Sequence, residues 1–207
     1  MNIKSTLKFS VTFSILLTLM IINLFTSCKC RACEDKEEGT VPLEIVTKSN
    51  DFIISITGKD FFEKYITPDF ARTKNIPPDY EMAYKLLMPD KPYVNATIKF
   101  TVDSLGKVLK NQDVVGIPRC ISFPEQCDFN IDEQSAEQIA SNMGLQEGVR
   151  DWEVGFMWDS NLQRYVWRIL TTLSEFGGEE NYRGTGQEMI IDPNTGEVLE
   201  LNDWRIN

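Results

Sequence analysis

Three of the chain's five cysteines stand within six positions, in the stretch NLFTSCKCRACEDKEEGT at residues 23–40. Cysteine side chains bind metals, exchange disulfides or carry covalent modifications, and the spacing and context decide between these chemistries. Cys30 and Cys33 form a C-x-x-C pair, which is typical of a redox motif at the start of a helix, or of half a zinc site. Neither context is present, because a charged stretch follows the pair and the chain contains no histidine.

The segment before these cysteines has the features of a secretory signal peptide. Lys4 and Lys8 precede an apolar run that ends at Phe25, and the run contains no acidic residue. A membrane-spanning helix needs about 20 apolar residues, which is more than this run supplies. We predict that residues 1–27 direct export. Export places Cys30 and Cys33 in an oxidising compartment, where we expect a disulfide or two oxidised thiols.

The end of that run, Phe25-Thr26-Ser27-Cys28, resembles the lipobox of bacterial lipoproteins, in which small residues precede a lipidated cysteine. Phe25 departs from the usual leucine. The resemblance implies palmitate-type acylation of Cys28, with each buried methylene contributing about 0.8 kcal/mol to membrane attachment. The expected location is therefore a bacterial membrane, most simply the outer membrane, on its periplasmic or surface side. Plain secretion and an uncleaved anchor are the alternatives. Residues 28–40 then form a flexible acidic tether.

Composition narrows the classes of function. The chain has 31 acidic and 21 basic residues, a formal net charge of −10, which argues against nucleic acid as a partner. Without histidine, Ser-His-Asp and Cys-His catalysis and histidine-ligated zinc are excluded. Carboxylate, Ser/Lys or cysteine-only chemistry remains. Ser104 and Lys107 have the S-x-x-K spacing but lie in a predicted turn rather than at the start of a helix. We expect no metal and no cofactor.

Residues 41–128 form the first predicted folded region. We predict short strands in PLEIV (42–46) and DFIISI (51–56), with continuation of the second into a helix at GKDFFEKYI (58–66) as the alternative. A short helix starting at Pro78 or Asp79 is expected to pack Met82 and Leu86 before Pro89. A hairpin follows, with one strand in which Ala96, Ile98, Phe100 and Val102 alternate, a turn at residues 103–106 and a returning strand at residues 108–115.

Cys120 and Cys127 enclose six residues, including a proline. A disulfide across so short a loop stabilises the fold by about 2 kcal/mol on the chain-entropy model. We predict that this pair is a structural disulfide rather than a reactive one.

The last third, residues 129–207, predicts a helix followed by an antiparallel meander. Asp132 is a candidate N-cap, apolar residues recur at helical spacing up to Met143, and Gly144 ends the pattern. Two alternating strands follow, DWEVGFMW and RYVWRILTTL, and then a hairpin around Asp192-Pro-Asn-Thr-Gly196. The expected fold class is α+β, an antiparallel sheet meander packed with one or two helices.

The helix with SAEQIA, the strand YVWRI and the hairpin MIIDPNTGEVLEL resemble the PepSY domain, a small α+β, cystatin-like module of exported bacterial proteins. The resemblance covers roughly residues 129–201, and the insertion FGGEENYRG departs from the compact pattern. It implies a non-catalytic interaction module associated with the cell envelope and with modulation of peptidases. It supplies no catalytic residues.

The candidate binding surface consists of aromatic residues on the predicted meander. Trp152, Trp158 and Trp167 would present a surface for a peptide or glycan, although aromatic residues alternating on one sheet face more often form a core. Glu133 and Glu137 share a helix face, where a solvated surface is the simpler interpretation. Asp192, Asn194 and Gly196 only faintly resemble a calcium loop, since Glu197 stands where glycine is required.

Two hypotheses of function remain. The first is a lipid-anchored envelope protein that binds a protein or peptide partner, for example by adding it as a strand to the sheet edge. The alternative is an exported hydrolase or thiol-redox enzyme that uses carboxylates or the Cys30/Cys33 pair.

Overall fold

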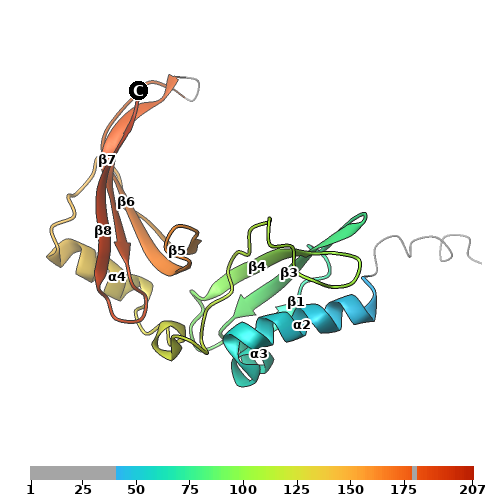
Figure 1. The fold of residues 1–207 in the computed structure, drawn as a ribbon. Coiled ribbons are helices and arrows are strands. Elements are labelled where there is room, and N and C mark those ends of the chain that lie inside the picture. Colours follow the sequence, from blue (N-terminus) through green and yellow to red (C-terminus); the bar gives the residue numbers. More distant parts are fainter. Residues whose placement is uncertain (1–40, 179–180) are drawn as a thin grey trace, which may run out of the picture. The chain divides into compact units, whose positions relative to one another are not determined.

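The structure is a computed structural model, and it describes residues 41–178 and 181–207. These residues form helices α2, α3 and α4 and two antiparallel sheets of four strands each (Figure 1). The α+β class predicted from the sequence is confirmed. The predicted signal peptide and tether, and with them Cys28, Cys30 and Cys33, lie outside the described residues.

Helix α2, Leu43–Thr57, opens the described fold. The prediction of two strands in this stretch is wrong. The 15 residues of this helix include no glycine or proline. Its buried residues recur every three to four positions, which is the spacing of one helix face. They are Ile45, Val46, Ser49, Ile53 and Thr57. Gly58 then ends the helix with φ of +85°, and the predicted helix after it is confirmed as α3, Lys59–Tyr65.

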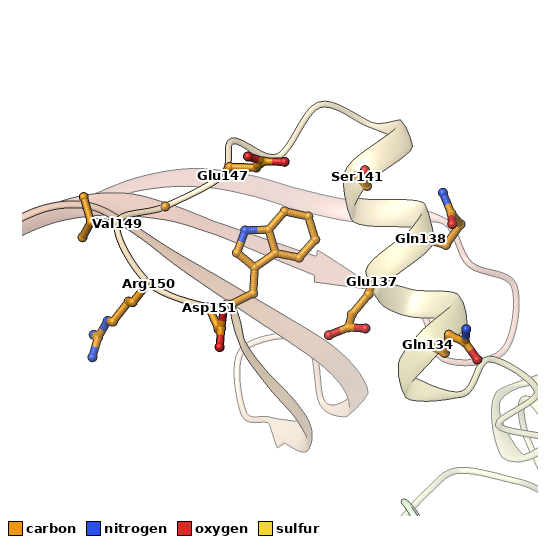
Figure 2. A pocket seen from close by; sticks show the side chains of 10 residues that line it. Gln134, Glu137, Gln138, Ser141, Glu147, Val149, Arg150 and Asp151 are labelled. Atoms are coloured by element: carbon orange, nitrogen blue, oxygen red, sulfur yellow. The ribbon is translucent and has the colours of Figure 1, made fainter.

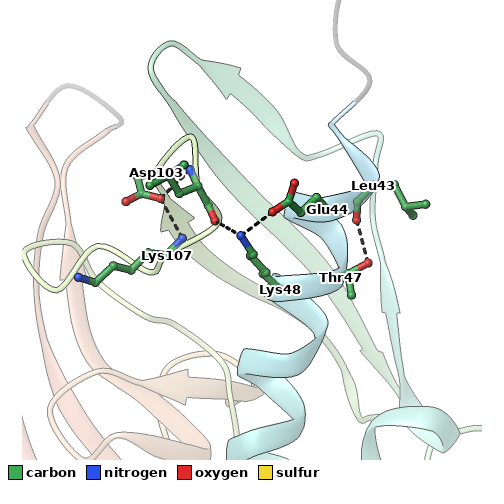
Figure 3. A network of polar contacts seen from close by, with 7 residues as sticks. Leu43, Glu44, Thr47, Lys48, Asp103 and Lys107 are labelled. Atoms are coloured by element: carbon green, nitrogen blue, oxygen red, sulfur yellow. Dashed lines mark hydrogen bonds and ion pairs between the residues drawn. The ribbon is translucent and has the colours of Figure 1, made fainter.

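A polar network fixes the first turns of α2 against the turn that follows strand β4, Asn95–Val102 (Figure 3). Lys48 Nζ donates to Glu44 Oε1 at 2.7 Å and to the carbonyl oxygen of Leu105 at 2.8 Å. In the turn itself, the Asp103 carboxylate accepts from the backbone N–H groups of Leu105 and Lys107, each at 2.9 Å. The predicted turn at residues 103–106 is therefore present, and the lysine links it to the helix.

The first sheet is built on strand β3, Asp79–Leu87, where the sequence had predicted a helix. Met82 and Leu86 are four residues apart, a spacing that fits both a helix and one face of a strand. The structure resolves this ambiguity because β3 is hydrogen-bonded along both of its edges. Strands β1, Ile66–Pro68, and β2, Lys74–Ile76, share one edge, and β4 pairs along the other.

Strand β4 is confirmed, with Ile98, Phe100 and Val102 almost fully buried. The returning strand predicted at residues 108–115 does not form. Only two isolated bridges join that segment to β4, Lys99 with Val115 and Val102 with Val108. The long-range partner of β4 is β3, which precedes it in the chain, and the following segment covers its other edge only in part.

The second sheet has the order β5-β6-β7-β8, with strands at Glu153–Asp159, Arg164–Phe176, Arg183–Ile191 and Val198–Ile206. Every neighbouring pair is antiparallel, as predicted for the last third of the chain. Strand β6 ends at Phe176 and strand β7 begins at Arg183, so the two strands include both ends of the FGGEENYRG insertion. Helix α4, Glu133–Asn142, lies against one face, and its Ala136 and Ala140 are fully buried. Met143, predicted to share that face, is 58% exposed.

Two hydrophobic clusters form the core, and they meet at Tyr93 and Phe156, which pack against both. The first cluster lies mainly between α2 and the first sheet but also includes Tyr165 of β6. The Tyr165 hydroxyl donates to the carbonyl oxygen of Gly116 at 2.8 Å. The second cluster joins α4 to Trp167, Ile169, Met189 and Ile191 of the second sheet. Residues 41–128 and 129–207 therefore share core contacts.

The predicted Cys120–Cys127 disulfide is present, next to a short 3-10 helix at Pro124–Cys127. It precedes the segment that leads into α4. Across residues 41–178 and 181–207, none of the helices has the length and apolar character needed to cross a membrane.

Candidate binding groove

A groove of about 840 Å³, the α4 groove, lies between helix α4 and the segment that leads into β5 (Figure 2). Its volume is within the range of small-molecule sites. The lining combines amide, hydroxyl, carboxylate and indole groups: Gln134, Glu137, Gln138, Ser141, Glu147, Gly148, Val149, Arg150, Asp151 and Trp152.

Helix α4 forms one wall, and its N-terminus is fixed by the cap predicted from the sequence. The Asp132 carboxylate accepts a hydrogen bond from the backbone N–H of Ser135 at 2.8 Å. Hydrogen bonding from Ser135 lowers the pKa of Asp132 below its usual value. Ala136 and Ala140 pack against the sheet, and Gln134, Gln138 and Ser141 lie on the exposed face of the helix, where they border the groove (Figure 2).

The other wall, residues 147–152, is held against strand β6 at its β-bulge. The bulge falls between Thr172 and Ser174. Gly148 lies so close to β6 that an added Cβ would stand 2.6 Å from the carbonyl oxygen of Thr172. The N–H of Val149 donates to that same oxygen at 2.7 Å, and Arg150 Nε donates to Thr172 Oγ1 at 3.1 Å. This wall is therefore anchored by backbone contacts as well as by side chains.

Trp152 joins the groove to the core. Its indole packs partly against the second hydrophobic cluster, and its Nε1 donates to the carbonyl oxygen of Gln146 at 3.2 Å. The side chain is half-buried, and it also lines the groove. A ring held in this way offers a fixed aromatic surface, because its orientation is set before any ligand arrives.

The other two tryptophans of the predicted surface lie elsewhere. Trp167 is only 1% exposed and donates from Nε1 to the carbonyl oxygen of Ile131 at 2.8 Å, so it belongs to the core. Trp158 packs against the first cluster, with its ring centroid 5.2 Å from that of Tyr165. The three rings therefore do not make one surface. Trp158 of β5 and Trp167 of β6 share one face of the second sheet, and that face packs against the core, whereas Trp152 precedes β5.

The predicted Asp192–Gly196 turn serves structure. Asp192 is 4% exposed, and its Oδ1 accepts from the N–H and the side-chain amide of Asn194 at 2.8 and 2.9 Å. Its Oδ2 accepts from Arg164 Nη2. Burial by itself raises the pKa of Asp192, but the hydrogen bonds from Asn194 and the charge of Arg164 outweigh it, so the pKa lies below its usual value.

Of the two helix glutamates singled out in the sequence, Glu137 lines the α4 groove and Glu133 is exposed outside it. Glu137 extends from the helix toward the side of Asp151 (Figure 2). Within the described ranges, 41–178 and 181–207, no group of three or more cysteine, aspartate or glutamate side chains is placed to hold a metal ion.

The sequence indicates Trp152 and Glu137 as separate candidates, but it does not predict that both line the same groove. The residues that complete the groove come from EGVRD at 147–151, a stretch with no periodic pattern and no motif. Their position depends on the contacts of Gly148 and Val149 with β6, which no local spacing predicts.

In comparisons with known proteins, no family model matches the chain and no curated protein matches it.

Proposed function

We propose that this chain is a lipid-anchored protein of the bacterial cell envelope that acts by binding a protein or peptide partner in the α4 groove. The observation that carries the proposal is the groove itself, an 840 Å³ space with a pre-oriented indole and several exposed hydrogen-bonding groups. Ligand sites use placed polar groups to orient a ligand, and the lining of the α4 groove is mostly polar, with one indole. The PepSY resemblance of residues 129–201 supports the same class of function, and the lipobox at Cys28 supports the location.

The groove walls suit an extended segment of polypeptide. Gln134, Gln138 and Ser141 offer side-chain donors and acceptors along one face of α4, which can pair with the backbone of a bound chain. The contacts of residues 147–152 with β6 hold the opposite wall in place, so little ordering is required when the partner binds.

Site-specific photo-crosslinking in the living envelope tests the binding function. A photoreactive amino acid at Gln138 lies in the groove, and the same amino acid at Gln112, an exposed residue of the first half, is the matched control. We expect a discrete adduct from position 138 only, and its loss when Trp152→Ser is added. Equal adducts from both positions, or an adduct indifferent to Trp152→Ser, would contradict the proposal.

The anchor has its own test. We expect the mass of the native protein to include acyl chains and the protein to fractionate with detergent, and we expect Cys28→Ala to abolish both. An unlipidated, freely released protein would refute the anchor but not the groove. Alkylation of the folded protein without reductant addresses the thiol-enzyme alternative, because a redox enzyme cycles Cys30 and Cys33 whereas a structural disulfide stays blocked.

A further inference from the structure

The α4 groove carries carboxylates that nothing in the described protein neutralises. Glu137, Glu147 and Asp151 all line it, and within residues 41–178 and 181–207 none of the three takes part in an ion pair or a side-chain hydrogen bond. These three carboxylates give the lining of the groove a negative charge, which attracts a cation.

The single basic residue of the lining is engaged outside the groove. Arg150 Nη2 pairs with Glu153 at 2.9 Å, and its Nε lies 3.9 Å from a Glu175 carboxylate oxygen. The same Nε donates to Thr172 Oγ1 at 3.1 Å. The side chain points away from α4 (Figure 2). Arg150 therefore fixes the wall of the groove, and its charge is balanced by Glu153 and Glu175 rather than by the groove carboxylates.

The indole of Trp152 supplies the second element of a cation site. A Lys or Arg head group over an indole face is attracted by the ring quadrupole, and tryptophan is the most favourable of the aromatic residues for this contact. The apolar stem of the same side chain packs on the ring surface while its charged head remains among carboxylates. The hydrogen bond from Trp152 to Gln146 and the packing on the second cluster keep the ring in place.

We propose that the α4 groove recognises a basic segment of its protein partner, by seating a Lys or Arg side chain on Trp152 with its charge among Glu137, Glu147 and Asp151. This inference rests on the proposed binding function and specifies the chemistry of the partner. A peptide is favoured over a free cation because the groove is far larger than one ammonium group and because α4 presents Gln134, Gln138 and Ser141 to a backbone.

The test uses the full-length protein in detergent and three fluorescent peptides of Gly and Ser that differ at one position, Lys, Gln or Glu. Binding is followed by fluorescence anisotropy and by the NMR signal of the Trp152 indole N–H. We expect saturable binding of the Lys peptide, with movement of that signal, and no binding of the Gln and Glu peptides. Raising the salt from about 0.05 M to about 0.5 M weakens binding, since exposed charges are screened.

Two double variants separate local recognition from general electrostatics. Glu137→Gln with Asp151→Asn removes two groove carboxylates, and we expect it to weaken binding of the Lys peptide by about tenfold. Glu133→Gln with Asp128→Asn makes the same change of charge at exposed residues outside the groove lining and should leave the affinity unchanged. Trp152→Leu should weaken binding, whereas Trp152→Phe should retain part of it.

Equal binding of the Lys and Gln peptides, equal loss in both double variants, or retention by Trp152→Leu would overturn the cation site. Binding of free lysine amide as tightly as the peptide would overturn the choice of a peptide. The photo-crosslink at Gln138 keeps the two proposals distinct. If that adduct forms while the Lys peptide fails to bind, only the basic specificity is wrong, and if neither is seen, both proposals fall.

Discussion

The side-chain oxygen of Asn194 accepts a hydrogen bond of 2.8 Å from the backbone N–H of Phe129, a residue 65 positions earlier in the chain. The neighbouring Pro193 carbonyl oxygen accepts from the N–H of Ile131 at 2.9 Å. The turn between β7 and β8 thus holds the segment that leads into α4, and through it one wall of the α4 groove. A sequence pattern first recognised as a hairpin turn therefore also positions the helix.

Asn194→Ala should destabilise the protein by about 1–3 kcal/mol, because Phe129 is fully buried and its N–H would lose its partner. Urea unfolding of the purified protein measures the change. Asn202→Ala is the matched control, since Asn202 lies exposed on the edge strand β8 and should change the free energy of unfolding by less than about 0.5 kcal/mol. Equal effects of the two substitutions would contradict the structural role of Asn194.

Asp192 should make stability depend on pH in the acid range. Its folded-state pKa is lowered, so its contribution is present above the unfolded value of 3.8 and is lost as the pH falls through the folded pKa. Asp192→Asn should remove part of this dependence. At neutral pH it should also cost about 3 kcal/mol, because Arg164, itself mostly buried, would lose its partner. Urea unfolding across pH 7 to about pH 3 tests both effects. An unchanged pH profile in the variant would refute the assignment.

Gly186→Ala should be strongly destabilising. An added Cβ at Gly186 would stand 1.9 Å from the carbonyl oxygen of Thr171 and 2.5 Å from the Trp204 ring, so the sheet or the indole must move. Overpacking of this kind costs about 1–3 kcal/mol or more. Gly178→Ala provides the comparison, since nothing lies within 4 Å of its Cβ position. Thermal unfolding of the two variants should differ clearly, and similar melting temperatures would count against the tight packing of Trp204.

Replacing both Cys120 and Cys127 by alanine should lower the free energy of unfolding by about 2 kcal/mol, the loop-closure value for a separation of seven residues. In this variant, reductant should no longer lower the unfolding midpoint through the Cys120–Cys127 bond. Because Cys30 and Cys33 are kept in the variant, the comparison isolates the Cys120–Cys127 bond. A midpoint equal to that of the oxidised parent would show that the disulfide contributes nothing.

The last third of the chain could be predicted from its sequence because its signals are local. Asp132 and Gly144 bracket α4, and alternation of apolar residues marks β5, β6 and the final hairpin. The residue periodicity and the residues that end each element therefore predict the same structure. The first half was harder. Helix α2 is rich in β-branched residues, which favour strands, although Ile45, Ser49 and Ile53 have the spacing of one helix face.

Strand β3 and the α4 groove could not be predicted from the sequence, for different reasons. The spacing of Met82 and Leu86 fits two structures, and only pairing with β1, β2 and β4 decides between them. The groove wall at residues 147–152 has no secondary structure signal, and its place is set by the close approach of Gly148 to β6 and by the hydrogen bonds from Val149 and Arg150 to Thr172. Tertiary contacts that are distant in sequence determine both.

The packing of Tyr93 and Phe156 into both core clusters has a mechanical consequence. Val41, where the described chain begins, packs on the first cluster, and Trp152 at the groove packs on the second. If the protein is held from its N-terminal side while a ligand pulls on the groove, the packing contacts of Tyr93 and Phe156 carry part of the force between the two halves. The two halves would then transmit force as a coupled body, and the strength of their junction would set how much load a tethered partner can exert before the halves separate.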